Sequence, residues 1–275
     1  MMNILESLIY GLISGLSEFL PISSQGHQAL LKYLFGATSP EPIREIMVHI
    51  AMLVAVYIAN GTYLDRIKRE RKIRTSRKRG IQADRTITQD LRLIRTAGFP
   101  MLIGIILLAF TSNLGNNLGW LSLFFVISGI ILYIPEHLPH ANKTAGQLGP
   151  MDSLLIGLFG GLSCLPGVSR IGGSVSYAIA RGADQAKAYN WVLVLSIPAL
   201  ILLIILDIVS IFFTGFGMIS FMSVLGYLIA AIAAFAASFA GIYVMRKIID
   251  RSGITFFAFY CWGTAFLSCF LYLFT

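Results

Sequence analysis

Six uninterrupted apolar stretches limit what this chain can fold into. Each is close to the roughly 20 residues that an α-helix needs to cross the hydrocarbon core of a bilayer. They occupy residues 46–64, 95–114, 117–135, 189–213, 219–245 and 254–274. Of the 275 residues, 56% are apolar and only 12% are charged, which leaves too few polar side chains to cover a soluble globule. We therefore predict an all-α, polytopic integral membrane protein with one membrane domain over residues 1–275.

Two further apolar regions, 4–36 and 151–182, are interrupted near the middle by proline and small polar residues. Neither half of either region is long enough to cross a bilayer, so we expect two re-entrant pairs of short helices. The two interruptions read Leu20-Pro21-Ile22-Ser23-Ser24-Gln25-Gly26-His27 and Leu165-Pro166-Gly167-Val168-Ser169-Arg170.

The two interrupted regions resemble each other, and three predicted spans follow each copy. We interpret this as a duplication, with repeat one at 4–135 and repeat two at 151–274. A re-entrant pair adds no crossing, so each repeat crosses three times and the second begins on the opposite face. The repeats are therefore expected to be inverted, with their interruptions meeting near the midplane. Chance similarity of two Gly/Leu-rich helices is the alternative. The matching segments are Gly11-Leu12, Gly15-Leu16-Ser17, Leu20-Pro21 and Ser24 against Gly157-Leu158, Gly161-Leu162-Ser163, Leu165-Pro166 and Ser169.

Basic residues orient the chain. The predicted loop 65–95 is the most basic segment and is assigned to the cytoplasm by the positive-inside rule. Counting membrane crossings from this loop places every basic residue except Lys32 and Arg44 at the cytoplasmic side, or on a segment that enters the membrane from that side. Both termini and the opening of the first re-entrant pair are then expected at the outer face. The pI near 9.5 thus reflects topology, and no nucleic-acid partner is expected; binding of anionic lipid by the loop is the alternative. The loop contains Arg66, Lys68, Arg69, Arg71, Lys72, Arg74, Arg77, Lys78, Arg79, Arg85, Arg92 and Arg95.

The first interruption carries groups that can do chemistry. Glu18 lies at membrane depth, where a carboxylate is costly, and its candidate roles are metal ligand and general base. If a helix restarts here, Ser23 or Ser24 is its N-cap, and its free N–H groups, Gly26 included, attract phosphate. Ser24 and His27 then share a face and suit nucleophilic or acid–base chemistry. The structural alternatives are a Glu18 that reaches interfacial water, serines that only cap, and a His27 that only forms hydrogen bonds.

The second interruption carries Arg170 among small and apolar residues. A guanidinium at this depth needs an anion, and its planar fork suits phosphate oxygens. Gly167 allows close backbone approach, and Ser169 and Ser174 are candidate phosphate contacts. The structural alternative is an ion pair between Arg170 and Glu18.

Other polar residues are weaker candidates. His49 begins a span and is interpreted as structural, and Asp207 is expected to face the membrane interface. His137 and His140 lie in a loop without a cysteine or carboxylate cluster, so no metal is expected there.

These motifs resemble a known family. The run from Gly15 to His27 and the run from Pro166 to Arg170 are similar to the two signatures of the undecaprenyl-diphosphate phosphatases of the bacitracin-resistance type. The resemblance covers essentially the whole chain. It implies a bacterial inner-membrane protein with inverted repeats. It also implies an enzyme that hydrolyses the terminal phosphate of undecaprenyl diphosphate at the outer face, recycles the lipid carrier of cell-wall synthesis and uses Mg²⁺ or Ca²⁺.

Carried over by position, the resemblance implies catalytic roles for Glu18, Ser24, His27 and Arg170, with Glu18 also a metal ligand. Ser174 stands where the family usually has threonine. Two positions depart from the pattern: Ser14 replaces the first of two acidic residues, and Ile171 replaces a serine. Each departure removes a group of use to the chemistry, a carboxylate in the first case and a hydroxyl in the second.

Two functions therefore remain open. The first is a polyprenyl-diphosphate phosphatase, favoured by Glu18, Ser24 and His27. The second is a carrier that binds or flips a polyprenyl phosphate, favoured by Ser14 and by broken helices at the midplane. A third possibility, another lipid-phosphatase superfamily with a Ser-Arg-x5-His signature, is disfavoured because Ser176 stands where its histidine belongs. The lipid and the bilayer are the expected partners, and a homodimer is possible.

Overall fold

Helices make up the regular structure of this computed structural model, which describes residues 2–37, 41–75, 84–139, 141–216, 219–251 and 253–274. Within these ranges there is no strand, and one isolated parallel bridge joins Lys143 and Ala183. The elements are α1 (Ile4–Phe19), α2 (Ser24–Leu34), α3 (Pro42–Ala59), α4 (Gly61–Thr75), α5 (Arg85–Leu108), η1 (Ala109–Asn116), α6 (Leu118–Tyr133), η2 (Ile134–His137), η3 (Ala145–Gln147), α7 (Pro150–Gly161), η4 (Leu162–Cys164), α8 (Arg170–Ala180), α9 (Gln185–Thr214), α10 (Phe221–Arg251) and α11 (Phe256–Phe274).

Five helices, α3, α6, α9, α10 and α11, are long and apolar enough to cross a membrane. Their outward surfaces carry large apolar side chains, of which Phe212 and Phe213 are each 84% exposed. A surface of this kind is suited to lipid and not to water. The prediction of an all-α chain with several candidate membrane spans is confirmed.

The sixth expected span, 95–114, falls on α5 and η1. The first part of α5 carries Arg85, Asp90 and Arg92, and the α-helix gives way to a 3₁₀-helix at Ala109. The apolar part of α5 is therefore too short to span a bilayer as one uninterrupted α-helix. This sixth span stays a prediction.

Both interrupted regions fold as two short helices joined at the proline. Leu20 and Leu165 each precede a proline and are extended, with ψ of 154° and 115°, because the proline ring disfavours helical geometry in the residue before it. Each second helix then restarts behind a serine N-cap, Ser23 for α2 and Ser169 for α8, whose hydroxyl accepts a hydrogen bond from the backbone N–H three residues on. The two helices of each pair pack against each other, α1 on α2 and α7 on α8.

The glycines of the duplicated motif serve close helix packing. Gly11 and Gly15 lie on α1 against the backbone of Ala230 and Ala234 in α10, where an added Cβ would lie 2.1 and 2.3 Å from carbonyl oxygens. Gly157 on α7 faces α5 in the same way, with an added Cβ 1.9 Å from the Ala97 carbonyl oxygen. Small residues four apart let two helices approach this closely within a membrane.

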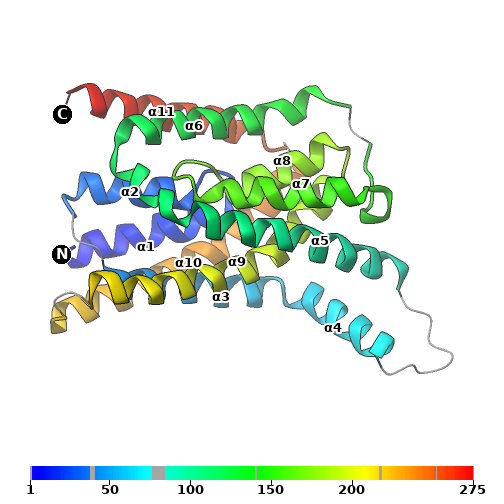
Figure 1. Cartoon of the computed structure of the whole chain (residues 1–275), viewed down its shortest axis with the longest axis horizontal. Coiled ribbons are helices and arrows are strands. Elements are labelled where there is room, and N and C mark those ends of the chain that lie inside the picture. The colour runs from blue at the N-terminus through cyan, green and yellow to red at the C-terminus, as the bar shows by residue number, and fades with distance from the viewer. Residues whose placement is uncertain are drawn as a thin grey trace.

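The helices run side by side, with the start of α1 and the end of α11 at the same end of the molecule and α4 at the opposite end (Figure 1). The basic segment 65–95 differs from the expected loop because α4 continues through it to Thr75 and α5 begins at Arg85. Lys and Arg are good helix formers, and the Asp84 carboxylate caps α5 by accepting the N–H of Thr86. Arg77, Lys78, Arg79 and His140 lie outside the described residues.

Candidate functional site

The two interruptions meet in the middle of the helix bundle. A Cβ added to Gly26 would lie 2.8 Å from the backbone of Gly167, so only glycine permits this approach. Ser23 joins the two regions, since its Oγ accepts hydrogen bonds from the N–H groups of both Gly26 (3.3 Å) and Gly167 (3.1 Å). Its φ of 68° is a strained conformation for a residue other than glycine. Gln25, with its amide nitrogen toward the second region, donates to the carbonyls of Ser163 and Cys164.

Glu18 and Arg170 form an ion pair at this meeting point, from the end of α1 and the start of α8. Both side chains are buried, with 7% of each residue exposed. Arg170 Nη2 contacts Glu18 Oε1, whereas Arg170 Nε and Nη1 have no hydrogen-bond partner among the described residues. A buried guanidinium with two unsatisfied donors is suited to a second anion.

A cavity of about 20 Å³ lies beside this ion pair, enough room for one water molecule. A diphosphate would need a larger opening than this cavity offers. The polar side chains that line the cavity come from both interrupted regions and, in one case, from α3. They are Ser17, Glu18, Ser23, Ser24, Gln25, His49, Ser163 and Arg170.

Ser24 and His27, expected to act together, have different surroundings. Ser24 lines the cavity; its Oγ donates to the Ser14 carbonyl (3.1 Å) and accepts from the Gln28 amide (3.4 Å). His27 is not part of the cavity lining, and both of its ring nitrogens are engaged: Nδ1 with the Ser23 carbonyl and Nε2 with the Tyr260 hydroxyl of α11, each at 2.8 Å. This arrangement suits the structural alternative for His27.

The remaining candidates have the following places. Ser169 Oγ caps α8 by accepting the Gly172 N–H (3.0 Å), and its own N–H donates to Ser128 (3.3 Å). Ser174 Oγ donates to the Ile156 carbonyl (2.8 Å), so this hydroxyl is engaged between α8 and α7. Ser14 and Ile171 are the two positions that depart from the family pattern. Ser14 is fully buried, and its Oγ has no hydrogen-bond partner within the described ranges. Ile171 is fully buried in the hydrophobic core.

The sequence did not connect His49 and Asp207 with the cavity or with each other. His49 in α3 lines the cavity, and its Nδ1 lies 2.6 Å from Asp207 Oδ2 in α9. The available signal was two ionisable residues inside two different predicted spans, which in membranes tend to pair. Nothing local indicated that they would meet, because 158 positions separate them in the chain.

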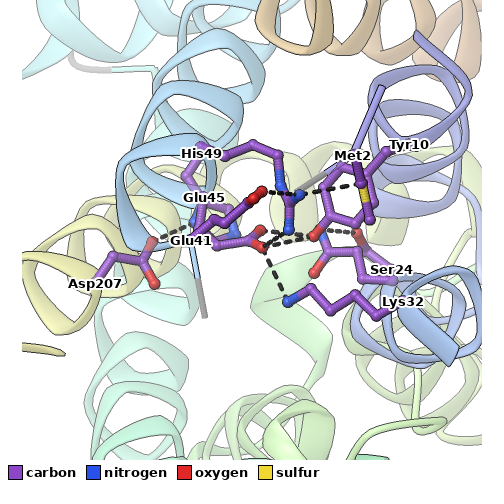
Figure 2. A network of polar contacts seen from close by, with 10 residues as sticks. Met2, Tyr10, Ser24, Lys32, Glu41, Glu45, His49 and Asp207 are labelled. Carbon is purple, nitrogen blue, oxygen red and sulfur yellow. Dashed lines mark hydrogen bonds and ion pairs between the residues drawn. The ribbon is translucent and has the colours of Figure 1, made fainter. Parts of the chain in front are cut away.

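A larger charged network continues from His49 toward the end of the molecule where α2 ends and α3 begins (Figure 2). The centre of this network is Glu45, which lies one turn before His49. The Glu45 carboxylate accepts a hydrogen bond from the Tyr10 hydroxyl (2.7 Å) and forms ion pairs with Lys32 (2.9 Å) and Arg44 (3.2 Å). Lys32 and Arg44 are the two basic residues predicted to lie on the outer side, and both form an ion pair with the Glu45 carboxylate.

Fold and site together define a helical membrane protein with a buried arginine and carboxylate where two interrupted helix pairs meet. The sequence model of the family described as bacitracin resistance protein BacA matches residues 7–267. The chain belongs to this family, which confirms the resemblance seen in the sequence.

Relatives named undecaprenyl-diphosphatase match along nearly their whole length. The one from Treponema denticola is 28% identical over 94% of this chain and 94% of its own. The one from Carboxydothermus hydrogenoformans is 29% identical over 95% of this chain and 94% of its own. Undecaprenyl-diphosphatase 3 from Bacillus cereus is 29% identical over 97% of this chain and 96% of its own.

Proposed function

We propose that this protein is a polyprenyl-diphosphate phosphatase of the bacterial cytoplasmic membrane. It hydrolyses the terminal phosphate of undecaprenyl diphosphate and so recycles the lipid carrier of cell-wall synthesis. The observation that carries the proposal is Arg170, a buried guanidinium with two unsatisfied donors beside Glu18 and Ser24. Family membership and the shared name of the relatives support the same activity.

The chemistry follows from charge and position. Phosphoryl transfer depends mainly on stabilising the charge on the phosphoryl oxygens and on placing the attacking group in line. Arg170 Nε and Nη1 would hold the diphosphate, while Glu18 keeps the guanidinium oriented. Of Ser24 and His27, only Ser24 lines the cavity. Its hydroxyl would attack phosphorus or orient a water molecule that attacks.

The side chains around Glu18 decide how a divalent metal ion could bind. Among the described residues, no group of three or more His, Cys, Asp or Glu side chains could hold an ion. Mg²⁺, however, is commonly held by one or two carboxylates together with substrate phosphates, and Glu18 supplies one carboxylate. The donors therefore fit an ion that arrives with the diphosphate, held on the protein side by Glu18. Such an ion would neutralise phosphate charge.

We also propose the inverted-repeat topology, with re-entrant pairs α1–α2 and α7–α8 and the sixth crossing completed by α5 and η1. The packing supports it: α1 lies on α10 and α7 on α5, so each pair packs on the second span of the other repeat. Likewise α3 packs on α9 and α6 on α11, which are equivalent spans. This topology opens the first pair, and the site, to the outer face.

The test is phosphate release from undecaprenyl diphosphate by the purified protein, with and without Mg²⁺, beside Arg170→Ala and Ser14→Glu variants. We expect release by the unaltered protein and its loss in Arg170→Ala. A Ser14→Glu change restores the second carboxylate that the family pattern has. Absence of release by the unaltered protein, even with Mg²⁺, would overturn the proposal.

The second candidate function, a carrier of polyprenyl phosphate, is favoured by Ser14, which puts a hydroxyl where the family has an acid. Its test is lipid movement in proteoliposomes. Movement without phosphate release, with release gained in Ser14→Glu, would replace the phosphatase with a carrier.

A further inference from the structure

We propose that His49 is the general base and acid of the reaction and that Asp207 is its positioning residue. This inference rests on the proposed phosphatase function and assigns its proton transfer to an imidazole outside the two interrupted regions. Its starting observation is the cavity, whose lining includes His49 together with Glu18, Arg170 and Ser24.

The side-chain geometry leaves one ring nitrogen for chemistry. Nδ1 of His49 is taken by Asp207 Oδ2 at 2.6 Å (Figure 2), so Nε2, on the opposite side of the ring, is the nitrogen available to the cavity. A carboxylate on Nδ1 fixes the tautomer in which Nε2 accepts a proton, and it stabilises the imidazolium that results.

Location argues against a purely packing role. Both residues are ionisable and lie inside apolar helices that are candidate spans, α3 and α9. Ionisable residues at such depth are costly, and they face an interior or water-filled path and pair with one another. His49 is 7% exposed and lines the cavity, so it combines a carboxylate partner with a place in the lining that Glu18 and Arg170 share.

His27 is the competing imidazole and is worse placed. Its Nδ1 and Nε2 are both engaged at 2.8 Å, with the Ser23 carbonyl and the Tyr260 hydroxyl. A base whose two nitrogens hold α2 against α11 has to break one of these contacts before it takes a proton. His49 does not have to break a contact, because Nδ1 is the one ring nitrogen of His49 with a hydrogen-bond partner among the described residues.

The proton-transfer step balances as follows. The oxygen of an attacking O–H group bonds to the terminal phosphorus, and its proton passes to His49 Nε2. The bond from that phosphorus to the bridging oxygen breaks, and the bridging oxygen leaves on the lipid monophosphate with the electron pair. His49 then returns the proton to that oxygen. With water as the attacking group, the products are lipid monophosphate and inorganic phosphate.

The experiment measures kcat and KM for phosphate release from undecaprenyl diphosphate by the full chain in detergent. The variants are His49→Ala, His49→Gln, Asp207→Asn and Asp207→Glu. His137→Ala is the matched control, because His137 is exposed, does not line the cavity, and has its ring in contact with the carbonyl and the ring of Tyr133. We expect kcat to fall by about 10²-fold or more in both His49 variants with KM within about threefold, the usual size of a general-base contribution.

Imidazole added to His49→Ala separates chemistry from structure. We expect it to restore kcat, and we expect no effect in His49→Gln, where the amide fills the space but takes no proton. Asp207→Asn should lower kcat, and Asp207→Glu should retain more of it. If His49→Ala does not fold, as judged by gel filtration, the folded His49→Gln variant decides.

Each contrary outcome has its own meaning. Release by His49→Gln at the rate of the unaltered protein, with Arg170→Ala inactive, would overturn the role of His49 and leave the phosphatase function standing. Absence of release by the unaltered protein would overturn the function, and the role of His49 with it. A loss of kcat in His49→Ala that imidazole does not restore, with full activity in His49→Gln, would make the His49–Asp207 contact structural.

Discussion

Arg170 combines an ion pair with unused hydrogen-bonding capacity. It pairs with Glu18, as the structural alternative expected, while its Nε and Nη1 have no partner among the described residues. The ion pair and the proposed phosphate site are therefore compatible. A buried arginine that lost its carboxylate would be left uncompensated, at a cost of about 3–5 kcal/mol for a broken buried pair.

Replacing Arg170 with lysine tests whether the planar fork is needed. Lysine keeps the charge but offers its donors from a single point. In Arg170→Lys we expect kcat/KM for phosphate release to fall by about 10²–10³-fold, as for the loss of one aimed donor. Arg181→Lys is the control, because Arg181 is half exposed and does not line the cavity. Its Nε forms an ion pair with Asp152 Oδ1 at 2.6 Å. Equal activity in the two variants would contradict the role given to the fork.

Asp90, near the start of α5, predicts a pH effect on stability. Burial raises the pKa of its carboxyl above the ordinary value, although the hydrogen bond from the Tyr63 hydroxyl (2.7 Å) acts in the opposite direction. The protonated form is then favoured by folding, so its contribution is present at low pH and is lost as the pH rises through the folded-state pKa.

We therefore expect Asp90→Asn to unfold at a higher temperature than the unaltered protein at pH 8. The difference should shrink as the pH falls toward 4, because the carboxyl of the folded protein then becomes protonated. Thermal unfolding in detergent at the two pH values measures this. Asp65→Asn, an exposed carboxylate on the neighbouring α4, serves as the control. A gap between Asp90→Asn and the unaltered protein that did not change with pH would contradict the argument.

At the scale of the helices, the site exists because two interrupted pairs touch through glycine. A Cβ on Gly26 would lie 2.6 Å from the Phe125 ring and 2.8 Å from the backbone of Gly167. Backbone does not yield as a flexible side chain does, so α2 would have to move away from the second interruption. The cavity would widen, and the Ser23 bridge to the Gly167 N–H would be lost.

Gly26→Ala is therefore expected to destabilise the protein by about 1–3 kcal/mol, the usual cost of overpacking, and to lower phosphate release. Gly263→Ala is the matched control, since Gly263 lies in α11 with nothing within 4 Å of an added Cβ. Thermal unfolding and phosphate release of both variants provide the comparison. An unaltered melting temperature for Gly26→Ala would show that the two interruptions do not pack as described.

At the scale of the whole molecule, charge and fold agree on one polarity. The two chain ends lie at one end of the bundle and the basic α4 at the other (Figure 1). Positive charge next to a membrane span favours the cytoplasmic side, so both termini are predicted at the outer face.

Reporter fusions test this polarity. Alkaline phosphatase, which folds only outside the cytoplasm, should be active when fused after Thr275 and inactive when fused after Thr75. A fluorescent protein that matures only in the cytoplasm should give the reverse pattern. An inactive alkaline phosphatase together with a fluorescent reporter after Thr275 would place the C-terminus in the cytoplasm. That result would invert the topology and put the first interrupted pair at the wrong face for the proposed reaction.

Local pattern alone determined the apolar helices, the interruptions and most of the candidate chemistry, whereas the basic helix α4 was expected to be a loop. Apolar length sets which segments suit a bilayer, proline ends a helix at the residue before it, and serine caps the next; all three effects act within a few residues. Glu18, Ser24 and Arg170 were predictable for the same reason, because polar residues inside apolar segments stand out.

Only the tertiary structure decided which of these groups meet. Three positions separate Ser24 from His27, yet one faces the cavity and the other Tyr260 in α11. His49 and Asp207 are far apart in the chain and meet because α3 packs on α9. Such contacts depend on how whole helices pack, and packing sums many weak interactions between segments that no local pattern records.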